Sequence, residues 1–288
     1  MKESQRLREL LAGDEVHVAP GVFDGISARL VEQAGFDLVY ASGGAISRSM
    51  GYPDMGLLSM SEVLTRLAPI VDSVTIPVIA DADTGYGNAL NAQRAVQEFE
   101  RLGVAGLHLE DQVFPKRCGH YEDKSIVRPA EMVQKIRAAR DAAQDSDLVI
   151  IARTDAIAVE GLSAAIDRAA AYAEAGADVL FVEAPQSEAQ IEEIGRRLPQ
   201  PKLLNMFLGG KTPIVPLNRL QAWGYRLVIV PSDLQRAALF AMNDVLRALK
   251  ADGHSAELAG RMTSFSDREN IVGTAGYLDL DACYRIES

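Results

Sequence analysis

Residues 77–111 read PVIADADTGYGNALNAQRAVQEFERLGVAGLHLED and contain two apolar runs on either side of a segment with helical spacing. The runs at 78–81 and 106–110 have the length and apolar content of buried strands, and the segment at 91–102 is rich in the residues that favour helices. Gly103 follows this segment as a stop signal. The stretch therefore predicts a strand, a helix and a second strand, which is the repeating unit of a parallel sheet.

The same unit recurs along the whole chain. Eight short apolar runs occur at 16–19, 37–41, 78–81, 106–110, 148–153, 179–183, 202–205 and 226–230. Helical segments lie between most of them, at 25–34, 91–102, 129–143, 162–175 and 188–198. Eight repeats predict an α/β protein with a closed (β/α)8 barrel, that is, a TIM barrel. An open doubly wound sheet is the alternative, although no Gly-x-Gly-x-x-Gly motif opens a helix after the first strand.

Composition limits the class of protein. With 288 residues, 48% of them hydrophobic, the chain can bury a large core, and no linker divides it, so we predict one domain over residues 1–288. The formal charge of −11 argues against a nucleic-acid partner and against binding to an anionic membrane. The 2 cysteines are too few for a disulfide scaffold, and the first residues lack a secretory pattern. These features predict a cytoplasmic protein with no membrane partner.

The carboxyl-terminal part is predicted to be a helical extension. Residues 234–251 have helical spacing, and the extension proper covers about 252–288. It contains more apolar side chains than a free tail needs: Phe265, Ile271, Val272, Tyr277, Leu278 and Tyr284. We therefore predict that the extension packs on a neighbouring subunit and serves oligomerisation.

Polar side chains gather just after the apolar runs. They are Ser42, Asp81, Asp83, Glu110, Asp111, Arg153, Asp155, Glu183 and Asn205. Any one of them could merely cap a helix, form an ion pair or close a turn. In a barrel, however, the carboxyl ends of all strands meet on the face that carries active sites. Repeated carboxylates at buried strand ends favour a hard cation such as Mg²⁺, and Arg153 supplies a cationic fork for a substrate carboxylate.

A cysteine with basic neighbours follows the fourth run. The stretch Lys116-Arg117-Cys118-Gly119-His120 predicts an exposed, electropositive loop that lowers the pKa of the thiol and lets it transfer a proton. A solvated surface turn, with Cys118 as a small buried hydrophobic residue, is the structural alternative.

These motifs together resemble the isocitrate lyase / phosphoenolpyruvate mutase superfamily, with a methylisocitrate lyase or dimethylmalate lyase type of sequence. The resemblance runs from about residue 15 to about 240, and the cysteine loop is its most specific part. Its motifs are Tyr40-Ala41-Ser42-Gly43-Gly44, Gly51-Tyr52-Pro53-Asp54, Asp81-Ala82-Asp83-Thr84-Gly85-Tyr86-Gly87, His108-Leu109-Glu110-Asp111-Gln112, Lys116-Arg117-Cys118-Gly119-His120, Ala152-Arg153-Thr154-Asp155-Ala156 and Glu183-Ala184-Pro185.

The resemblance also implies roles for individual residues. Asp81 would be the main ligand of Mg²⁺, with Mn²⁺ as the alternative, and Asp54, Asp83 and Glu110 would act largely through metal-bound waters. The catalytic group would comprise Cys118 as the proton donor, Lys116, His120 and Arg153. The small carboxylate substrate would be bound by residues spread over the strand ends and the loop: Tyr40, Ser42, Gly43, Gly44, His108, Gly119, Arg153, Glu183 and Asn205.

The implied activity is that of a carbon–carbon lyase (an oxo-acid-lyase) that acts through an enolate or aci-carboxylate intermediate. Its substrate would be a 2-hydroxy di- or tricarboxylate of the 2-methylisocitrate or dimethylmalate type, and its products a 2-oxo acid (pyruvate or glyoxylate) and a second carboxylate. A gating loop and a homotetramer with exchanged carboxyl-terminal helices are implied as well. The enzymatic alternatives are a carboxyphosphonoenolpyruvate or phosphoenolpyruvate type of phosphonomutase and an oxaloacetate hydrolase or decarboxylase. A barrel that only binds a carboxylate or a protein partner is the non-enzymatic alternative.

One segment departs from the pattern of short lyases. After the seventh run the chain reads Asn205-Met206-Phe207-Leu208-Gly209-Gly210, with Leu208 where the pattern has a carboxylate. This apolar side chain makes a tricarboxylate less secure as a substrate and favours an alkyl-bearing hydroxy acid. Arg117 replaces the commoner Lys, which keeps the charge and changes the geometry.

Overall fold

The computed structural model describes residues 1–119 and 123–285 and contains one closed barrel of eight parallel strands in chain order. Residues His17 of the first strand and Leu227 of the last lie opposite each other, so the sheet closes and the alternative of an open sheet is wrong. The strands are β1 (His17–Val22), β2 (Val39–Ala41), β3 (Val78–Asp81), β4 (Gly106–Glu110), β5 (Val149–Thr154), β6 (Val179–Val182), β7 (Lys202–Asn205) and β8 (Tyr225–Val230).

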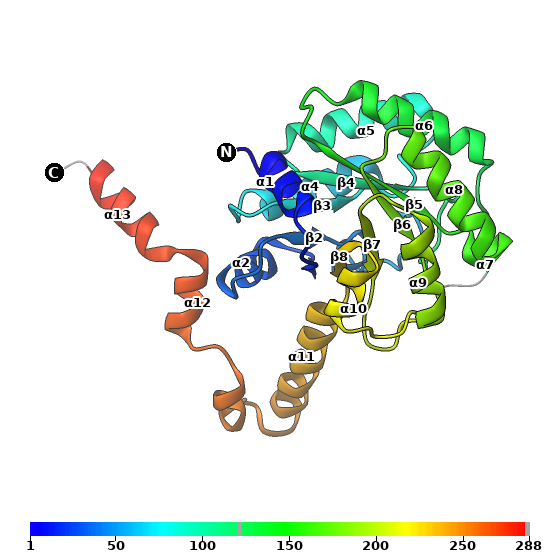
Figure 1. Ribbon diagram of the computed structural model, residues 1–288. Coiled ribbons are helices and arrows are strands. Elements are labelled where there is room, and N and C mark those ends of the chain that lie inside the picture. The colour runs from blue at the N-terminus through cyan, green and yellow to red at the C-terminus, as the bar shows by residue number, and fades with distance from the viewer. Residues whose placement is uncertain (120–122, 286–288) are drawn as a thin grey trace. The chain divides into compact units, whose positions relative to one another are not determined.

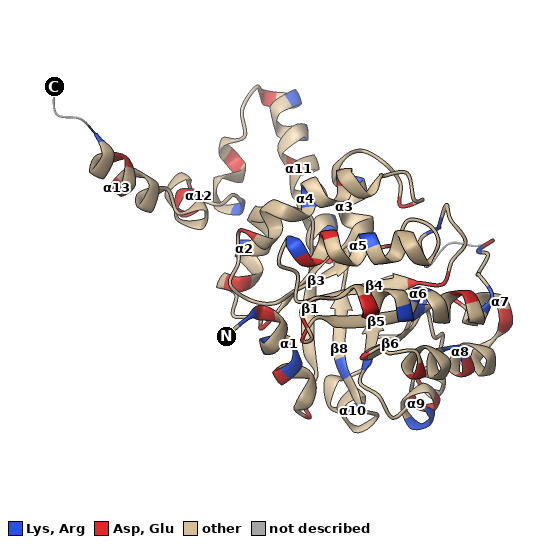
Figure 2. Ribbon diagram, turned by 90° about the horizontal axis from the view of Figure 1, so that it is seen from above, with Lys and Arg blue, Asp and Glu red and all other residues tan. Residues whose placement is uncertain are grey.

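Helices surround the barrel, as Figure 1 shows, and charged residues lie along those of the outer ring (Figure 2). The predicted (β/α)8 fold is therefore confirmed. The helices of this part are α1 (Glu3–Ala12), α2 (Gly25–Gln33), α3 (Gly43–Ser49), α4 (Met60–Val71), α5 (Ala89–Arg101), α6 (Pro129–Ala142), α7 (Ile157–Glu160), α8 (Leu162–Glu174), α9 (Glu188–Arg197) and α10 (Leu217–Ala222).

Local sequence signals explain where the helices begin and end. The side chain of Asn88 accepts a hydrogen bond from the backbone N–H of Leu90 at 3.0 Å and so caps the start of α5. Gly103, directly after the end of this helix, has a φ of +90°, a conformation that glycine adopts without steric cost. The start and the end of α5, between β3 and β4, are therefore determined by residues of this segment itself.

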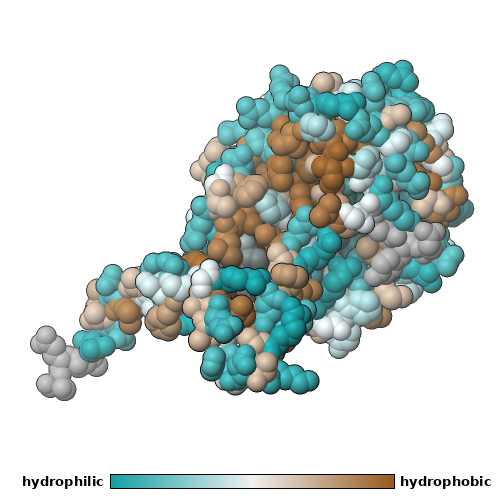
Figure 3. Space-filling view, turned by 90° about the horizontal axis from the view of Figure 1, so that it is seen from below, coloured by the Kyte–Doolittle hydropathy of each residue, from teal (hydrophilic) through white to brown (hydrophobic). Residues whose placement is uncertain are grey.

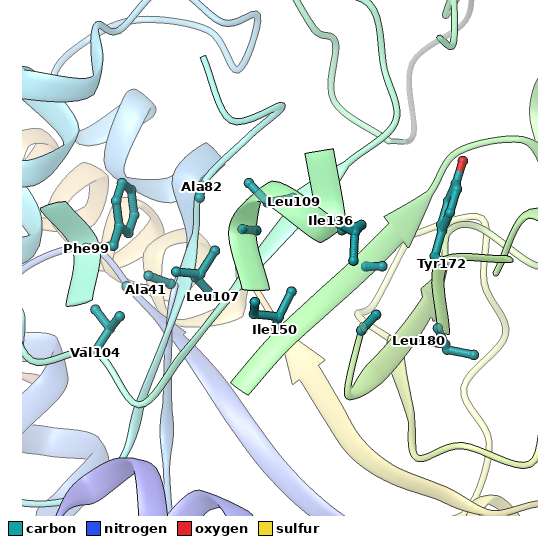
Figure 4. Close-up of a cluster of buried hydrophobic side chains, with 14 of the residues drawn as sticks. Ala41, Ala82, Phe99, Val104, Leu107, Leu109, Ile136, Ile150, Tyr172 and Leu180 are labelled. Atoms are coloured by element: carbon teal, nitrogen blue, oxygen red, sulfur yellow. The ribbon is translucent and has the colours of Figure 1, made fainter. Parts of the chain in front are cut away.

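Two apolar clusters fill the two layers of the barrel. The outer cluster lies between the strands and the helices, and Figure 4 shows part of it, with Leu107 and Leu109 of β4 near Ile136 of α6. The inner cluster contains Ile79, Ile151, Phe181 and other residues of alternate positions along the strands. Because successive side chains of a strand point to opposite faces, these clusters fix which positions face the interior.

The first helix closes the amino-terminal end of the barrel. Leu7 and Leu11 of α1 belong to the inner cluster, and the side chain of Leu7 lies against Gly106, the first residue of β4. The interior is thus filled with apolar groups from this end, and its polar groups lie towards the carboxyl ends of the strands.

The chain divides into two compact units, Met1–Leu234 with the barrel and Gln235–Ser288 with the helices that follow it. The boundary falls near the start of α11 (Asp233–Asp252), which precedes the short η1 (Ala256–Arg261), α12 (Phe265–Val272) and α13 (Thr274–Tyr284). Large apolar side chains of this second unit are exposed, and Figure 3 shows brown and teal residues side by side in the part that leads to the grey terminal atoms. The exchange of these helices between subunits stays a prediction. Within the described residues, no helix has both the length and the apolar content required to cross a bilayer.

Candidate active site

Seven polar side chains occupy interior positions at the carboxyl ends of the strands. In β4, for example, Leu107 and Leu109 belong to the outer cluster, so His108 and Glu110 face the interior. The same alternation applies to the neighbouring strands. The interior set is Tyr40, Asp81, His108, Glu110, Arg153, Glu183 and Asn205, and all of them are buried. The structure thus brings together residues that are up to 165 positions apart in the sequence, from 40 to 205.

The segment after β2 brings backbone close to two carboxylates: Gly43 lies beside Asp81, and Gly44 lies beside Asp54. Ser42 caps α3 by accepting a hydrogen bond from the backbone N–H of Ala45 at 3.3 Å, and Gly43 and Gly44 form the first residues of the helix. A Cβ atom on Gly43 would lie 2.6 Å from Oδ2 of Asp81. Any side chain at this position would fill the space beside the carboxylate, so the glycine keeps that space open.

Asp81 lies at the centre of a buried hydrogen-bond network. The hydroxyl of Tyr40 donates to Asp81 Oδ2 at 3.2 Å, and Nε2 of His108 lies 2.8 Å from the tyrosine oxygen and 3.3 Å from Asp81 Oδ1. Burial opposes ionisation of Asp81, but His108, Lys116 and Arg153 outweigh it and lower its pKa to about 2. Burial lowers the pKa of His108 to about 4, so near pH 7 the stabilising positive charge comes from Lys116 and Arg153. Asp81 is therefore an ionised carboxylate at neutral pH.

The ammonium group of Lys116 lies between two carboxylates. Its Nζ is 2.5 Å from Oδ1 of Asp54 and 2.8 Å from Oδ1 of Asp83. Burial raises the pKa of Asp83 to about 6, helped by the charges of Asp81 and Asp54 and opposed by that of Lys116. The pKa of Lys116 itself is raised well above its ordinary value, because Asp83 and Asp54 outweigh the effect of burial.

The prediction that Lys116 lies in an exposed, electropositive loop is wrong. Its side chain is only 4% exposed, and its charge is compensated by the two aspartates. Of the basic residues around Cys118, Arg117 is exposed, and His120 lies outside the described residues. The reason for the difference is tertiary: a buried ammonium group needs partners that satisfy it, here the carboxylates of Asp54 and Asp83, and the sequence does not show that these lie beside Lys116.

Glu110 is the least satisfied of these acids. It is fully buried, and among the described residues neither of its carboxylate oxygens has a hydrogen-bond partner. The nearest cation is Nη1 of Arg153, 3.3 Å from Oε2. Burial raises the pKa of Glu110 well above its ordinary value against the opposing charges of Arg153 and Lys116. A buried carboxyl group without a hydrogen-bond partner is rare in folded proteins, so this position is a candidate for a ligand, an ion or water that completes the site.

The guanidinium group of Arg153 is held as a fork by Asp155. Its Nε and Nη2 atoms donate to the two oxygens of this aspartate at 2.9 and 3.1 Å. The same group lies 5.1 Å from the centre of the Phe181 ring and 4.0 Å from Oε2 of Glu183, and the side-chain amide of Asn205 donates to Oε1 of Glu183 at 3.2 Å. Arg153 is therefore fixed in position at the carboxyl end of β5, and its guanidinium group also lies near Glu110 and Glu183 in the interior.

The segment that carries Cys118 packs onto these strand-end residues. The backbone N–H of Cys118 donates to the carbonyl oxygen of Asp54 at 3.2 Å, and the cysteine is partly buried. Gly119 is so close to the interior that a Cβ atom there would lie 2.5 Å from Nη2 of Arg153 and 2.6 Å from Oε1 of Glu183. The thiol segment, the guanidinium group and the acidic residues thus form one constellation.

Replacing Gly119 with alanine is expected to lower the activity at least tenfold while leaving the melting temperature within a few degrees of the wild type. The added methyl group would collide with two buried, hydrogen-bonded side chains and would displace the Cys118 segment, and small displacements of reacting groups are costly. Initial rates and thermal melts measure the two effects. The control is Gly13→Ala, because a Cβ atom there has no neighbour closer than 3.6 Å. Equal rates for both variants would contradict the packing described above.

Sequence reasoning missed one residue of the site and misplaced another. The missed residue is Lys124, which is buried and contacts Asp155. The only signal for it in the sequence is its position six residues after Cys118. Asp111, which was expected at the mouth with the other carboxylates, instead faces the layer between the barrel and α8. There it accepts hydrogen bonds from Thr154 Oγ1 at 2.7 Å and from the Tyr172 hydroxyl at 2.8 Å. The cause is the alternation along β4, which turns Asp111 away from the interior.

The described residues contain no group of three or more His, Cys, Asp or Glu side chains arranged to hold a metal ion by themselves. Lys116 already lies between Asp54 and Asp83, which excludes these two as joint direct ligands in this arrangement. The donor set nevertheless suits a hydrated divalent cation: Asp81 is ionised, Gly43 leaves space beside it, and among the described residues the oxygens of Glu110 have no hydrogen-bond partner. The roles of Asp54, Asp81, Asp83 and Glu110 towards a metal stay predictions.

The sequence matches the family described as phosphoenolpyruvate phosphomutase over residues 7–250. It is 43% identical over 285 residues to a 2,3-dimethylmalate lyase of Eubacterium barkeri, covering 99% of both chains. It is 42% identical over 276 residues to a 2-methylisocitrate lyase of Aeropyrum pernix, covering 96% of this chain and 89% of the relative. A chloroplastic carboxyvinyl-carboxyphosphonate phosphorylmutase of Arabidopsis thaliana is 40% identical over 284 residues, or 97% of this chain and 84% of that protein.

Solved structures with the same fold cover nearly the whole chain. An oxaloacetate acetylhydrolase in complex with the inhibitor 3,3-difluorooxalacetate superimposes with a TM-score of 0.92 at 34% identity, covering 98% of this chain and 96% of that one. A 2,3-dimethylmalate lyase, a member of the PEP mutase/isocitrate lyase superfamily, gives 0.91 at 36% identity, with 98% and 95% covered. A phosphonopyruvate hydrolase in complex with oxalate and Mg²⁺ gives 0.90 at 32% identity, with 99% of both chains covered.

Proposed function

We propose that this chain, which belongs to the phosphoenolpyruvate phosphomutase family within the PEP mutase/isocitrate lyase superfamily, cleaves the carbon–carbon bond of a 2-hydroxy dicarboxylate of the 2,3-dimethylmalate type or a tricarboxylate of the 2-methylisocitrate type. The products are a 2-oxo acid and a second carboxylate. Relatives named as lyases support the proposal, but others are named as a mutase or as hydrolases, so the assignment rests on the site itself.

The observation that carries the proposal is the position of the Cys118 segment. Lys116 anchors one side of it to Asp54 and Asp83, and Gly119 on the other side packs against Arg153. The backbone that carries the thiol is thereby held between Asp54 and the fixed guanidinium group of Arg153. This combination suits a reaction in which a carbanion is stabilised by positive charge and then protonated.

The residues would hold the substrate at both ends. The segment Ser42 to Gly44 would bind the carboxylate of the 2-oxo acid portion with its backbone N–H groups. Glu183 and Asn205 would bind the second product, beside Arg153. Tyr40 and His108 would line the cavity around Asp81, and Leu208 with Phe207 would leave room for an alkyl group. This apolar character favours the dimethylmalate type of substrate.

In the reaction, a buried carboxylate of the site would take the proton of the hydroxyl group on carbon 2, the oxygen forms a carbonyl, and the bond between carbons 2 and 3 breaks. Its electron pair stays on carbon 3 as an enolate or aci-carboxylate, whose negative charge Arg153 stabilises. The thiol of Cys118 then gives its proton to carbon 3. At the end of the cycle the proton taken by the carboxylate returns to the thiolate of Cys118. A divalent cation bound at Asp81 would supply the electron withdrawal that makes the hydroxyl acidic and the carbonyl electrophilic.

A panel of 2-hydroxy acids tests this function directly. The purified protein with Mg²⁺ is expected to release pyruvate from 2,3-dimethylmalate or 2-methylisocitrate, which a coupled dehydrogenase assay detects. Unsubstituted malate is the matched control, because it lacks the methyl groups that Phe207 and Leu208 would accept. The proposal would be contradicted if no member of the panel released a 2-oxo acid.

The second candidate function is that of a phosphonomutase or an oxaloacetate hydrolase. It is favoured by the 40% identity to a carboxyvinyl-carboxyphosphonate phosphorylmutase and by the similarity to an oxaloacetate acetylhydrolase. Phosphorus NMR of a phosphonate mixture distinguishes the mutase, since formation or loss of a carbon–phosphorus bond moves the resonance. Oxalate and acetate released from oxaloacetate would identify the hydrolase.

Removal of the metal is expected to abolish turnover. Treatment with EDTA should reduce 2-oxo acid release to background, and Mg²⁺ or Mn²⁺ should restore it. A second readout does not need activity: Mg²⁺ at about 100 times its Kd should stabilise the wild type by about 2.7 kcal/mol, which is a rise of several degrees in Tm. Asp81→Asn should lose this rise, because the charge that binds the ion is gone. Asp37→Asn, which alters an exposed partner of His17, is the control and should keep it. A rise of equal size in Asp81→Asn would contradict the assignment of this carboxylate.

We further propose a cytoplasmic homotetramer in which the second unit contacts neighbouring subunits. The exposed apolar side chains of this unit, among them Phe240, Leu246, Phe265 and Tyr277, support the proposal. Light scattering coupled to size-exclusion chromatography tests it: four chains are expected, and a monomer at micromolar concentration would contradict it.

A further inference from the structure

Lys124 is a buried cation that the reaction described above does not use. Its side chain is only 1% exposed, and its Nζ donates to Oδ1 of Asp155 at 2.8 Å and to the carbonyl oxygen of Gly119 at 2.5 Å. The two acceptors belong to different parts of the site. Asp155 follows β5 and is fully buried, whereas Gly119 is the neighbour of Cys118.

The contacts of Lys124 converge on the guanidinium group that would bind the substrate. Asp155 Oδ1 accepts from both Lys124 Nζ and Arg153 Nη2, and Oδ2 accepts from Arg153 Nε. Burial of Asp155 favours its neutral form, but the charges of Arg153 and Lys124 and their hydrogen bonds hold its pKa below the ordinary value. One carboxylate therefore joins two cations, and one of these cations also holds the backbone beside the thiol.

We propose that Lys124 is a positioning residue that ties the Cys118 segment to the Asp155–Arg153 pair and so fixes the proton donor relative to the substrate-binding guanidinium group. This inference rests on the proposed function for the roles of Cys118 and Arg153, but the contacts that carry it do not. An ammonium group in this place donates to a buried carboxylate and a buried carbonyl at once, which an apolar side chain cannot do.

The chemistry of the constellation explains why such a tie is useful. A proton donor must stay within hydrogen-bond reach of the carbon that it protonates, and a displacement of about 1 Å can cost about 10²-fold in rate. Cys118 lies on a loop segment, and Arg153 follows a strand of the barrel. Without a link between the two, the segment would depend on its other contacts, among them the packing of Gly119, the hydrogen bond from the backbone of Cys118 to Asp54 and the ion pairs of Lys116.

The test uses the two cysteines of the chain as reporters in the same molecule. Cys118 is partly buried in the site, and Cys283 is exposed in the second unit. The full-length protein is alkylated with iodoacetamide, and the rate at each cysteine is followed by peptide mass spectrometry. In Lys124→Met we expect alkylation of Cys118 to become at least about tenfold faster than in the wild type, while the rate at Cys283 stays the same.

Activity measurements complete the test. Lys124→Met is expected to lower kcat for the best substrate of the panel by about 10- to 100-fold, with a smaller change in KM, and Lys124→Arg should restore most of kcat because it keeps a buried cationic donor. Lys202→Met is the matched control. Lys202 is also buried and donates to two carbonyls, of Leu198 and Gln200, but it starts β7 at the opposite end of the barrel. It should leave Cys118 alkylation and kcat unchanged.

The outcomes separate this inference from the proposed function. Wild-type alkylation of Cys118 in folded Lys124→Met protein would overturn the inference, whatever the enzyme acts on. Faster alkylation together with no turnover of any 2-hydroxy acid would support the inference and contradict the proposed function. Should Lys124→Met not fold, as circular dichroism would show, Lys124→Leu gives the same comparison, since it also removes both the charge and the hydrogen-bond donors.

Discussion

Replacing Cys118 with serine is expected to lower kcat by about 10²- to 10⁴-fold, the usual contribution of a positioned general acid. The ordinary pKa of a cysteine thiol is about 8.5, so a thiol gives up its proton near neutral pH far more readily than the hydroxyl group of serine does. Serine has nearly the same size, and the main contacts of the segment come from the backbone of Cys118 and from Gly119. The KM should therefore change little, and the effect should appear in the chemical step.

The measurement is the rate of 2-oxo acid release at saturating substrate. Cys283→Ser is the matched control, because it makes the same chemical change at an exposed position in the second unit. This control should retain wild-type activity. A Cys118→Ser enzyme with unchanged kcat would remove Cys118 from the mechanism, and the proton would then have to come from another group.

Replacing Arg153 with lysine is expected to lower kcat/KM at least about 30-fold, even though the positive charge is kept. Arg153 uses Nε and Nη2 on Asp155 and has Nη1 3.3 Å from Glu110. A single ammonium group cannot reproduce this fork, and one partner would lose its contact. Breaking a buried, hydrogen-bonded charge pair typically costs about 2 to 5 kcal/mol, and 1.4 kcal/mol corresponds to a factor of ten.

Steady-state kinetics on the preferred substrate measure this loss. The matched control is Arg140→Lys. Arg140 is also paired with a single aspartate, Asp178, but this pair lies next to the start of β6, at the amino-terminal end of the barrel. Arg140→Lys should lower the melting temperature slightly and leave kcat/KM unchanged. If Arg153→Lys kept wild-type kcat/KM, Arg153 would not contact the substrate or the developing charge.

The fold could be predicted from the chain because its signals are local. The predicted strands at 78–81, 106–110 and 202–205 have the bounds of β3, β4 and β7, and the others differ by a few residues at their ends. Apolar runs, helical spacing and glycine stops act within about ten residues of each other, so they can be read without knowledge of distant contacts. Eight such units leave a closed barrel as the simplest arrangement.

For the candidate site, the sequence predicted which residues belong to it better than it predicted their contacts. The strand-end residues Asp81, Glu110, Arg153, Glu183 and Asn205 do meet, because side chains two positions apart on a strand face the same side. The prediction that Lys116 is exposed was wrong, the position of Asp111 differed from expectation, and Lys124 was missed. Lys116 and Lys124 lie in the loop after β4, where no period of the sequence fixes the direction of a side chain. Asp111, in contrast, continues the alternation of β4 and so faces outward.

The sequence by itself determined the repeating unit, the alternation that directs one set of side chains into the barrel, and the presence of acids, an arginine and a thiol with the chemistry of a lyase. Only the tertiary structure decided that β8 pairs with β1, that Lys116 is neutralised by Asp54 and Asp83, and that Lys124 joins Gly119 to Asp155. The physical reason is the distance along the chain over which each interaction acts. Propensity and periodicity depend on neighbours along the chain, whereas the burial of a charge depends on partners about 30 to 60 residues away, which come within about 3 Å only after the barrel has closed.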